Sequence, residues 1–164
     1  MYKILLVDDE ILVRMGLKTY IPWEDYGFTI AGEAGNGREA LEKCSVLNPD
    51  VIFTDIKMPY IDGIQLLEAL KKAYPHIRSV ILSCYDDFTL VKQAMKLGAS
   101  EYILKPTMQK EDLIQLLQNL KNEIVEMEAA HAFPSRSAAS PSMKESTTSD
   151  ILYSLIVKGD AGAY

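Results

Sequence analysis

Five polar side chains stand where apolar segments of the sequence end, and this placement suits a metal-assisted chemical site. Apolar runs end at the pair Asp8 and Asp9, at Asp55, at Ser83 and at Lys105. Three carboxylates that cluster repel one another, and a hard divalent cation relieves the repulsion. Mg²⁺ prefers oxygen ligands and keeps several waters, so one or two carboxylates together with phosphate oxygens are enough to hold it.

The same residue types are suited to phosphoryl transfer. A carboxylate can act as a nucleophile and form an acyl phosphate. The cation and the Lys105 ammonium would neutralise the transferred group, and the Ser83 hydroxyl would hydrogen-bond one of its oxygens. Each residue alone has an ordinary explanation, since Asp and Ser commonly cap turns and helices and a loop lysine is usually solvated. Their occurrence at successive segment ends favours a site.

The segments that carry these residues alternate between strand and helix patterns. Apolar runs predict strands at residues 3–7, 28–34, 51–54, 80–82 and 101–104, and helical spacing predicts helices at 11–20, 38–47, 63–74, 86–97 and 110–128. Such alternation predicts an α/β doubly wound fold, in which helices cover both faces of a parallel sheet. Sites in these sheets form at the carboxyl ends of the strands. The five polar residues are therefore expected to converge on one edge.

Composition limits the classes of function. The net charge of −6 argues against nonspecific binding of nucleic acid or of a membrane surface by this chain. The two cysteines form no CxxC pair, which is typical of buried thiols in a reducing compartment. Lys3 and the acids at positions 8–10 interrupt the N-terminal apolar stretch, and no apolar run is long enough to span a membrane. A cytoplasmic location is expected.

Four sequence motifs together resemble the CheY-like receiver domain of two-component response regulators. The resemblance covers about residues 1–125. Its motifs are Ile4-Leu5-Leu6-Val7-Asp8-Asp9-Glu10, the run from Asp50 to Pro59 with Asp62-Gly63, Leu82-Ser83, and the run from Gly98 to Pro106. The resemblance implies a five-stranded sheet with the flavodoxin-like order 2-1-3-4-5. It also implies a phosphorylation switch rather than an enzyme.

The resemblance assigns the metal and the phosphoryl acceptor. Asp55 is implied to accept a phosphoryl group from a sensor histidine kinase. Asp9 is implied to bind Mg²⁺ directly and Asp8 through water, while Asp55 and the backbone carbonyl of Lys57 complete the protein ligands.

The resemblance also assigns the residues that respond to phosphorylation. Ser83 is implied to be the switch hydroxyl and Tyr102 the switch aromatic residue. Lys105 is implied to contact the phosphoryl group, and its peptide bond to Pro106 is implied to be cis.

A narrower likeness concerns the output of the switch. Arg14-x-Gly16-Leu17, Ile21-Pro22-Trp23 and Tyr85-Asp86-Asp87-Phe88 resemble receivers that are attached to AraC-type DNA-binding domains. We expect a receiver domain at residues 1–129, a flexible Ser/Ala/Pro linker at 130–150, and the start of a truncated following domain at 151–164. DNA would then be bound only by the missing output domain.

The last predicted helix suggests a weak homodimer. Leu113, Leu116 and Leu120 follow three-then-four spacing and can line the stripe that covers the sheet. Ile124 and Met127 continue the pattern beyond the sheet, where they are expected to be exposed unless a partner covers them. A twofold dimer through the fourth helix, fifth strand and fifth helix, strengthened by phosphorylation, would cover them.

Three other functions fit parts of the pattern. A phosphatase of the haloacid-dehalogenase type would need an acid two residues after Asp55, where Lys57 stands. A flavodoxin-like cofactor protein would need a loop rich in Gly, Ser and Thr after the first strand, where Asp8, Asp9 and Glu10 would repel phosphate. A pseudo-receiver would act only by protein contact, which the complete set of site residues disfavours.

Overall fold

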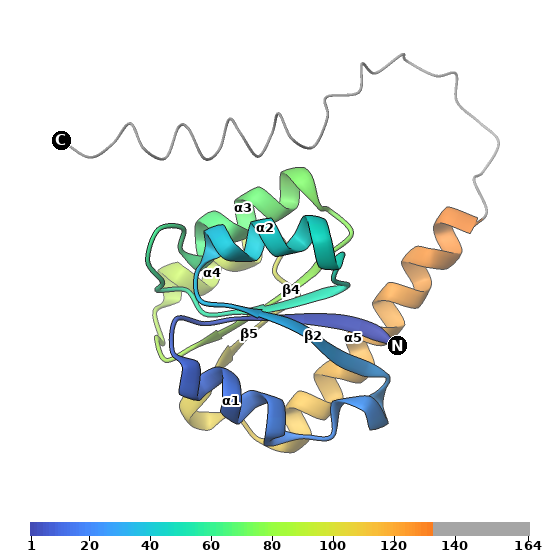
Figure 1. Ribbon diagram of the computed structural model, residues 1–164, viewed down its shortest axis with the longest axis horizontal. Coiled ribbons are helices and arrows are strands. Elements are labelled where there is room, and N and C mark those ends of the chain that lie inside the picture. The colour runs from blue at the N-terminus through green and yellow to red at the C-terminus, as the bar shows by residue number, and fades with distance from the viewer. Residues whose placement is uncertain (133–164) are drawn as a thin grey trace, which may run out of the picture.

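The computed structural model describes residues 1–132 and contains a five-stranded parallel sheet with helices on both faces (Figure 1). The strand order is β2-β1-β3-β4-β5, so both the α/β fold and the order 2-1-3-4-5 are confirmed. The strands are β1 (Tyr2–Val7), β2 (Phe28–Ala34), β3 (Val51–Thr54), β4 (Arg78–Ser83) and β5 (Glu101–Leu104). The α-helices are α1 (Ile11–Tyr20), α2 (Gly37–Leu47), α3 (Gly63–Ala73), α4 (Phe88–Lys96) and α5 (Lys110–Ala132). Two 3₁₀ turns, η1 (Trp23–Tyr26) and η2 (Lys105–Thr107), complete the elements.

The strands are apolar on both sides because each side faces a layer of helices. Figure 1 shows α1 and α5 on one face of the sheet and α2, α3 and α4 on the other. Along β1, Ile4 and Leu6 belong to the cluster on the α1 and α5 side, whereas Leu5 and Val7 belong to the cluster on the α2 and α3 side. Truncating one such leucine to alanine typically costs about 2–5 kcal/mol. These two cores hold the carboxyl ends of the strands in place.

Side-chain caps set the starts of three helices. Asp62 and Gln65 form a reciprocal capping box at the start of α3, and the Asn36 side chain caps α2. The Asp87 carboxylate accepts the Thr89 N–H at 2.8 Å, so α4 begins at Phe88, two residues later than expected. Beyond α4, Gly98 has a φ of +89°, the left-handed conformation that its position predicted.

The end of α5 differs from the expectation that underlay the dimer. Ile124 is only 7% exposed and belongs to the same buried cluster as Trp23 and Phe28. The short turn η1, which the sequence pattern did not reveal, contributes Trp23 to this cluster and contacts α5. Met127 is partly buried and its sulfur contacts the Arg78 guanidinium. The expectation that Ile124 is exposed is therefore wrong, because the domain itself covers it.

Helix α5 continues through Ala132, beyond the residue 129 at which the receiver domain was expected to end. The rest of the expected linker and the expected start of a further domain at 151–164 lie outside the described residues. Among residues 1–132, no helix is both long enough and apolar enough to cross a lipid bilayer.

Candidate functional site

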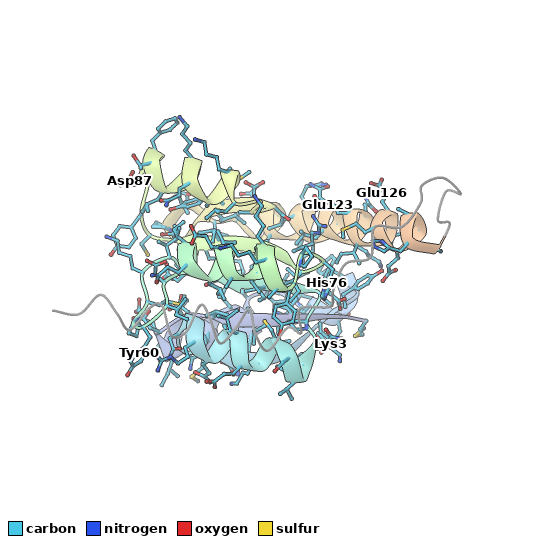
Figure 2. All side chains as sticks on the ribbon, turned by 90° about the horizontal axis from the view of Figure 1, so that it is seen from above. Lys3, Tyr60, His76, Asp87, Glu123 and Glu126 are labelled. Atoms are coloured by element: carbon cyan, nitrogen blue, oxygen red, sulfur yellow. The ribbon has the colours of Figure 1, made fainter. Side chains whose placement is uncertain are left out.

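The four strands that carry the candidate residues end at the same edge of the sheet, where β4 and β5 run two residues farther than β1 and β3. Val7 pairs with Thr54, Thr54 with Ile81, and Ser83 with Leu104, so the residues that follow these strands emerge at one edge. Figure 2 shows Tyr60 and Asp87, from the loops after β3 and β4, at one end of the molecule and Lys3 and His76 at the other. The predicted convergence at the carboxyl edge follows from this alignment.

Lys105 joins the two buried carboxylates at this edge. Its Nζ atom lies 2.6 Å from Oδ2 of Asp8 and 3.1 Å from Oδ2 of Asp55. Asp8 is 2% exposed and Asp55 is 7% exposed. The other oxygen of Asp55, Oδ1, accepts the Ile56 N–H at 2.7 Å. Asp55 is thus fixed by two donors in a largely buried position.

Burial and the paired charges act on the ionisation of this group. Burial raises the pKa of the Asp55 carboxyl, and the Lys105 ammonium partly offsets this increase by favouring the carboxylate. Burial alone would lower the pKa of Lys105, but its hydrogen bond to Asp8 and the charge of Asp55 outweigh that effect, so its pKa is raised. Lys105 therefore remains an ammonium ion and supplies a fixed positive charge beside the acceptor.

A group of acids next to this ion pair offers oxygen ligands for a metal. The nearest carboxylate oxygens of Asp8, Asp9 and Glu10 all lie within 4.8 Å of one another. Asp8 also accepts the Glu10 N–H at 2.9 Å. An all-oxygen, carboxylate-rich donor set fits Mg²⁺, as expected for receiver domains. Glu10 is a candidate ligand that the sequence analysis did not assign, although its place in the acidic run was a signal; Asp55 reaches Asp8 through Lys105 and is not itself in the group.

Tyr85 connects the residues assigned to the switch. Its N–H donates to the Oγ atom of the fully buried Ser83 at 3.1 Å, and its carbonyl oxygen accepts the Tyr102 hydroxyl at 2.7 Å. The Lys57 ammonium lies 3.8 Å from the centroid of the Tyr85 ring, which is a cation–π contact. Sequence reasoning placed Ser83, Tyr102 and Lys57 near the site but did not identify Tyr85 as the residue that links them.

The peptide bond before Pro106 corrects one expectation. The described residues contain no cis peptide bond, so the Lys105–Pro106 bond is trans. Pro106 lies in the first turn of η2, where proline is well accommodated because its ring fixes a helical φ and no N–H is needed. The Lys105 ammonium nevertheless reaches both Asp8 and Asp55.

The segment after the acceptor is held by close backbone contacts. The Gly63 N–H donates to the Ile56 carbonyl at 2.7 Å, and a Cβ atom on Gly63 would lie 2.2 Å from the Asp55 carbonyl oxygen. Only glycine fits here. On the opposite side of the loop, the Gly37 N–H donates to the Ile61 carbonyl at 3.0 Å. The loop between β3 and α3, which follows Asp55, is therefore held at Ile56 by Gly63 and at Ile61 by Gly37.

Comparisons with known proteins agree with this geometry. The model of the response regulator receiver domain family matches residues 4–118. The transcriptional regulatory protein YesN of Bacillus subtilis is 38% identical over 127 residues, which cover 77% of this chain and 33% of YesN. The chain thus spans about a third of that relative.

Two solved structures are similar in fold. The receiver domain of AraT, a response regulator from Geobacillus stearothermophilus, has a TM-score of 0.71 and 30% identity, over 77% of this chain and 98% of that one. The CheX–CheY–BeF₃–Mg complex from Borrelia burgdorferi has a TM-score of 0.65 and 28% identity, over 73% and 89% of the two chains. The chain belongs to the family of response regulator receiver domains.

Proposed function

We propose that Asp55 accepts a phosphoryl group from a sensor histidine kinase in the presence of Mg²⁺, and that phosphorylated Asp55 switches the surface of α4, β5 and α5. The observation that carries the proposal is the Lys105 ammonium between Asp8 and Asp55, since it brings residues from three strand ends into one charged site. Receiver domains act as signalling switches, and the acidic group of this chain is of the kind at which they bind Mg²⁺.

The transfer would proceed by exchange of one bond for another. An oxygen of Asp55 forms a bond to phosphorus while the phosphorus–nitrogen bond of a kinase phosphohistidine breaks, and the electron pair of that bond stays with the imidazole nitrogen. Lys105 holds the acceptor and balances the charge of the incoming group. Asp8, Asp9, Asp55 and the Lys57 carbonyl would hold Mg²⁺, which when bound neutralises negative charge on the phosphoryl oxygens.

The switch would use the hydrogen bonds of Tyr85. In this structure the Ser83 hydroxyl accepts a hydrogen bond from the Tyr85 N–H. When the hydroxyl turns to the phosphoryl group, that hydrogen bond breaks. Tyr102 is tied to the same residue through its hydroxyl, so a movement of the β4–α4 loop frees the ring to move inward. Such a local contact biases an element with two arrangements and changes the surface around it.

The output of the switch is proposed from the relatives. The name of YesN is that of a transcriptional regulator, which supports a DNA-binding output domain of the parent protein, joined through a linker that begins after α5 and extends to about residue 150. DNA would be contacted only by that domain, and no membrane partner is proposed. The family also supports a cytoplasmic location.

A weak homodimer through α4, β5 and α5 is proposed on a new basis. Ile124 does not support the dimer, because this side chain is buried within the domain. The support is the apolar exposure of Phe88 and Met95 on α4, together with the position of β5 at the edge of the sheet. Sedimentation with and without beryllofluoride tests the proposal, and a monomer in both states at high concentration contradicts it.

The experiment for the main proposal is intact-mass analysis after incubation with acetyl phosphate and Mg²⁺. We expect one added phosphoryl group, labile to hydroxylamine, and none in Asp55→Asn, because an amide is a poor nucleophile. Asp50→Asn is a matched control, since Asp50 lies just before β3 at the opposite edge of the sheet and accepts the Lys3 N–H. Stoichiometric labelling that persists in Asp55→Asn would refute the assignment of the acceptor.

A further inference from the structure

Arg14 makes two contacts that the proposed function does not use. It lies in the first turns of α1, and its side chain is 14% exposed. Its Nη1 atom donates to the main-chain carbonyl of Asp8, and its Nε atom donates to Oε1 of Glu33 on β2 at 3.2 Å. One guanidinium group therefore connects the end of β1, where the acids at positions 8–10 begin, with the neighbouring edge strand.

Apart from the ion pair between Lys105 and the Asp8 carboxylate, the segment from Asp8 to Glu10 has few other restraints. Glu10 is the N-cap of α1, and no side chain caps that helix. In the main chain, the Asp8 N–H donates to the Ala34 carbonyl at 3.0 Å, the Glu10 N–H donates to the Asp8 carboxylate at 2.9 Å, and the Glu10 carbonyl accepts the Arg14 N–H at 3.3 Å. Three carboxylates within 4.8 Å of one another repel and would drive this segment apart. The hydrogen bond that Arg14 donates to the main-chain carbonyl of Asp8 opposes that repulsion.

We propose that Arg14 is a positioning residue for the metal site: it holds the segment from Asp8 to Glu10, and with it the proposed ligands Asp8 and Asp9, in the arrangement that receives Mg²⁺. This inference rests on the proposed function, because the proposed function includes Mg²⁺ binding by these acids. Arg14 touches neither a reacting atom nor a carboxylate ligand of that group; it acts through the main-chain carbonyl of Asp8. Groups that orient metal ligands in this way typically affect metal affinity by about 10–100-fold.

The chemistry of the contact favours arginine. A guanidinium group has donors in a rigid fork and can serve two acceptors at once, whereas a lysine ammonium is a single point charge. Lys18, one turn further along α1, shows the difference, because it pairs with Oε2 of Glu33 at 2.8 Å and has no contact with Asp8 among the interactions of the described residues. Lys18 is therefore a matched control on the same helix and the same acceptor.

Glu33 is the second anchor of this contact. The hydrogen bond from Lys18 is the largest of the effects that lower the pKa of Glu33, and Arg14 adds to it, so Glu33 is held as a carboxylate. The Lys43 ammonium on α2 donates to the main-chain carbonyl of Glu33 and pairs with Glu39 at 2.8 Å. The anchor is thus itself fixed to α2, which makes it a suitable support for Arg14.

The sign of the effect separates positioning from simple electrostatics. Arg14 is a cation close to a proposed cation site. If it acted through its charge alone, its removal would strengthen Mg²⁺ binding, because like charges repel. If it positions the acidic segment, its removal weakens binding even though a repulsive charge is lost. A merely structural contribution to the fold would change the melting temperature without changing the affinity of the folded protein.

The test is calorimetric titration of the full chain with Mg²⁺ for the wild type, Arg14→Gln, Arg14→Lys, Glu33→Gln and Lys18→Ala, with melting curves recorded without metal to show that each is folded. We expect the dissociation constant to rise about tenfold in Arg14→Gln and in Arg14→Lys, which keeps the charge but loses the fork. Glu33→Gln, which retains an acceptor, should give a smaller rise, and Lys18→Ala should stay within about twofold of the wild type.

The outcomes distinguish the inference from the function on which it rests. A wild type that binds no Mg²⁺ would overturn the proposed metal site and the inference with it. A wild type that binds, with equal or tighter binding in both Arg14 variants, would overturn the positioning role alone. If Mg²⁺ binding weakened as much in Lys18→Ala as in Arg14→Lys, the positioning role of Arg14 would also be overturned. The effect would then come from the charges around Glu33 and not from the contact of Arg14 with Asp8.

Discussion

Lys105 brings together two carboxylates that come from distant parts of the sequence. Removing its charge leaves Asp8 and Asp55 buried and unpaired beside each other, and loss of one partner of a buried ion pair typically costs about 3–5 kcal/mol. We expect Lys105→Met to lower the free energy of unfolding by about 3 kcal/mol in urea titrations without metal. Mg²⁺ should restore part of this loss, because a ligand that binds only the folded state stabilises it.

Lys57→Met serves as the control for this experiment, because Lys57 is exposed at the same edge and its ammonium contacts the Tyr85 ring rather than a carboxylate among the interactions of residues 1–132. Its free energy of unfolding should change by less than about 1 kcal/mol. Equal losses in the two variants would show that Lys105 contributes no more than a surface lysine. A loss in Lys105→Met that Mg²⁺ leaves unchanged would argue against metal binding beside Asp8.

The two cysteines should differ sharply in reactivity. Cys44 lies on α2 and is fully buried in the core that this helix forms with the sheet, and burial raises the pKa of its thiol to about 12. Cys84 is exposed, directly after β4. Because the thiolate is the reactive form, iodoacetamide should modify Cys84 in the native protein and Cys44 only after denaturation. Peptide mass analysis checks this, with Cys84→Ser as the unreactive control; rapid native modification of Cys44 would contradict its burial.

The sequence predicted which residues meet at the site but not how they contact one another. Asp8, Asp55, Ser83 and Lys105 were identifiable because each follows an apolar strand, and parallel strands end at one edge. The hydrogen bonds of Tyr85 with Tyr102 and of Arg14 with the Asp8 carbonyl form only once folding brings these residues together. The spacing of residues along the chain does not predict them. The cis bond expected at Pro106 came from the family likeness, and the local turn η2 accommodates trans instead.

At the scale of elements, one glycine controls the distance between β3 and α3. A Cβ atom on Gly63 would overlap the Asp55 carbonyl oxygen, so Gly63→Ala must push the acceptor loop away from α3. We expect a loss of about 1–3 kcal/mol in the free energy of unfolding, as for other overpacked sites, and slower labelling by acetyl phosphate. Thermal denaturation and intact mass measure the two effects.

Gly16 provides the opposite control within α1. A Cβ atom there would meet no neighbouring atom within 4 Å, so Gly16→Ala adds a helix-favouring residue without a clash. Its free energy of unfolding should rise by up to about 1 kcal/mol, because alanine loses less backbone entropy than glycine in a helix. If both substitutions destabilised the protein equally, the close approach at Gly63 could not be the cause.

The boundaries of the elements were predictable where local signals are strong. The strands 28–34, 51–54 and 101–104 match β2, β3 and β5, because each is a short apolar or β-branched run between turn residues. The turn η1 was missed because four residues are too few for a period to emerge. Trp23 in that turn is fixed by tertiary contacts, since its indole N–H donates to the Leu17 carbonyl at 3.0 Å and its ring packs edge-on against Phe53. That missed turn is also why Ile124 is covered.

At the scale of the whole molecule, activation should alter one side of the sheet more than the rest. Ser83, Tyr85 and Tyr102 link the site to β5 and to the loop before α4. We expect beryllofluoride with Mg²⁺ to change hydrogen exchange in α4, β5 and the first turns of α5, while the cores beneath α2 and α3 stay unchanged.

Asp55→Asn provides the control for hydrogen exchange, because it should not bind the phosphoryl mimic as the wild type does. The hydrogen exchange of the wild type should then differ from that of the variant only in the presence of beryllofluoride. Exchange that changes in α2 and α3 but not in α4 and β5 would contradict the proposed route through Tyr85.

The fold class and the strand order were predictable at this scale, because five alternating units and the matched motifs leave few arrangements of a parallel sheet.

Helix α5 has a mechanical consequence. Its N-terminal turns pack on the sheet near η2 and its far end projects beyond the sheet (Figure 1). At 1.5 Å per residue the 23 residues form a lever about 35 Å long. A tilt of about 5° at the end nearest Lys105 would carry Ala132 sideways by about 3 Å, and Ile124, which is buried in the core, by about 2 Å. Because close-packed interiors resist such shifts, α5 would pass a movement on to residue 132 only if the core around Ile124 moved with it.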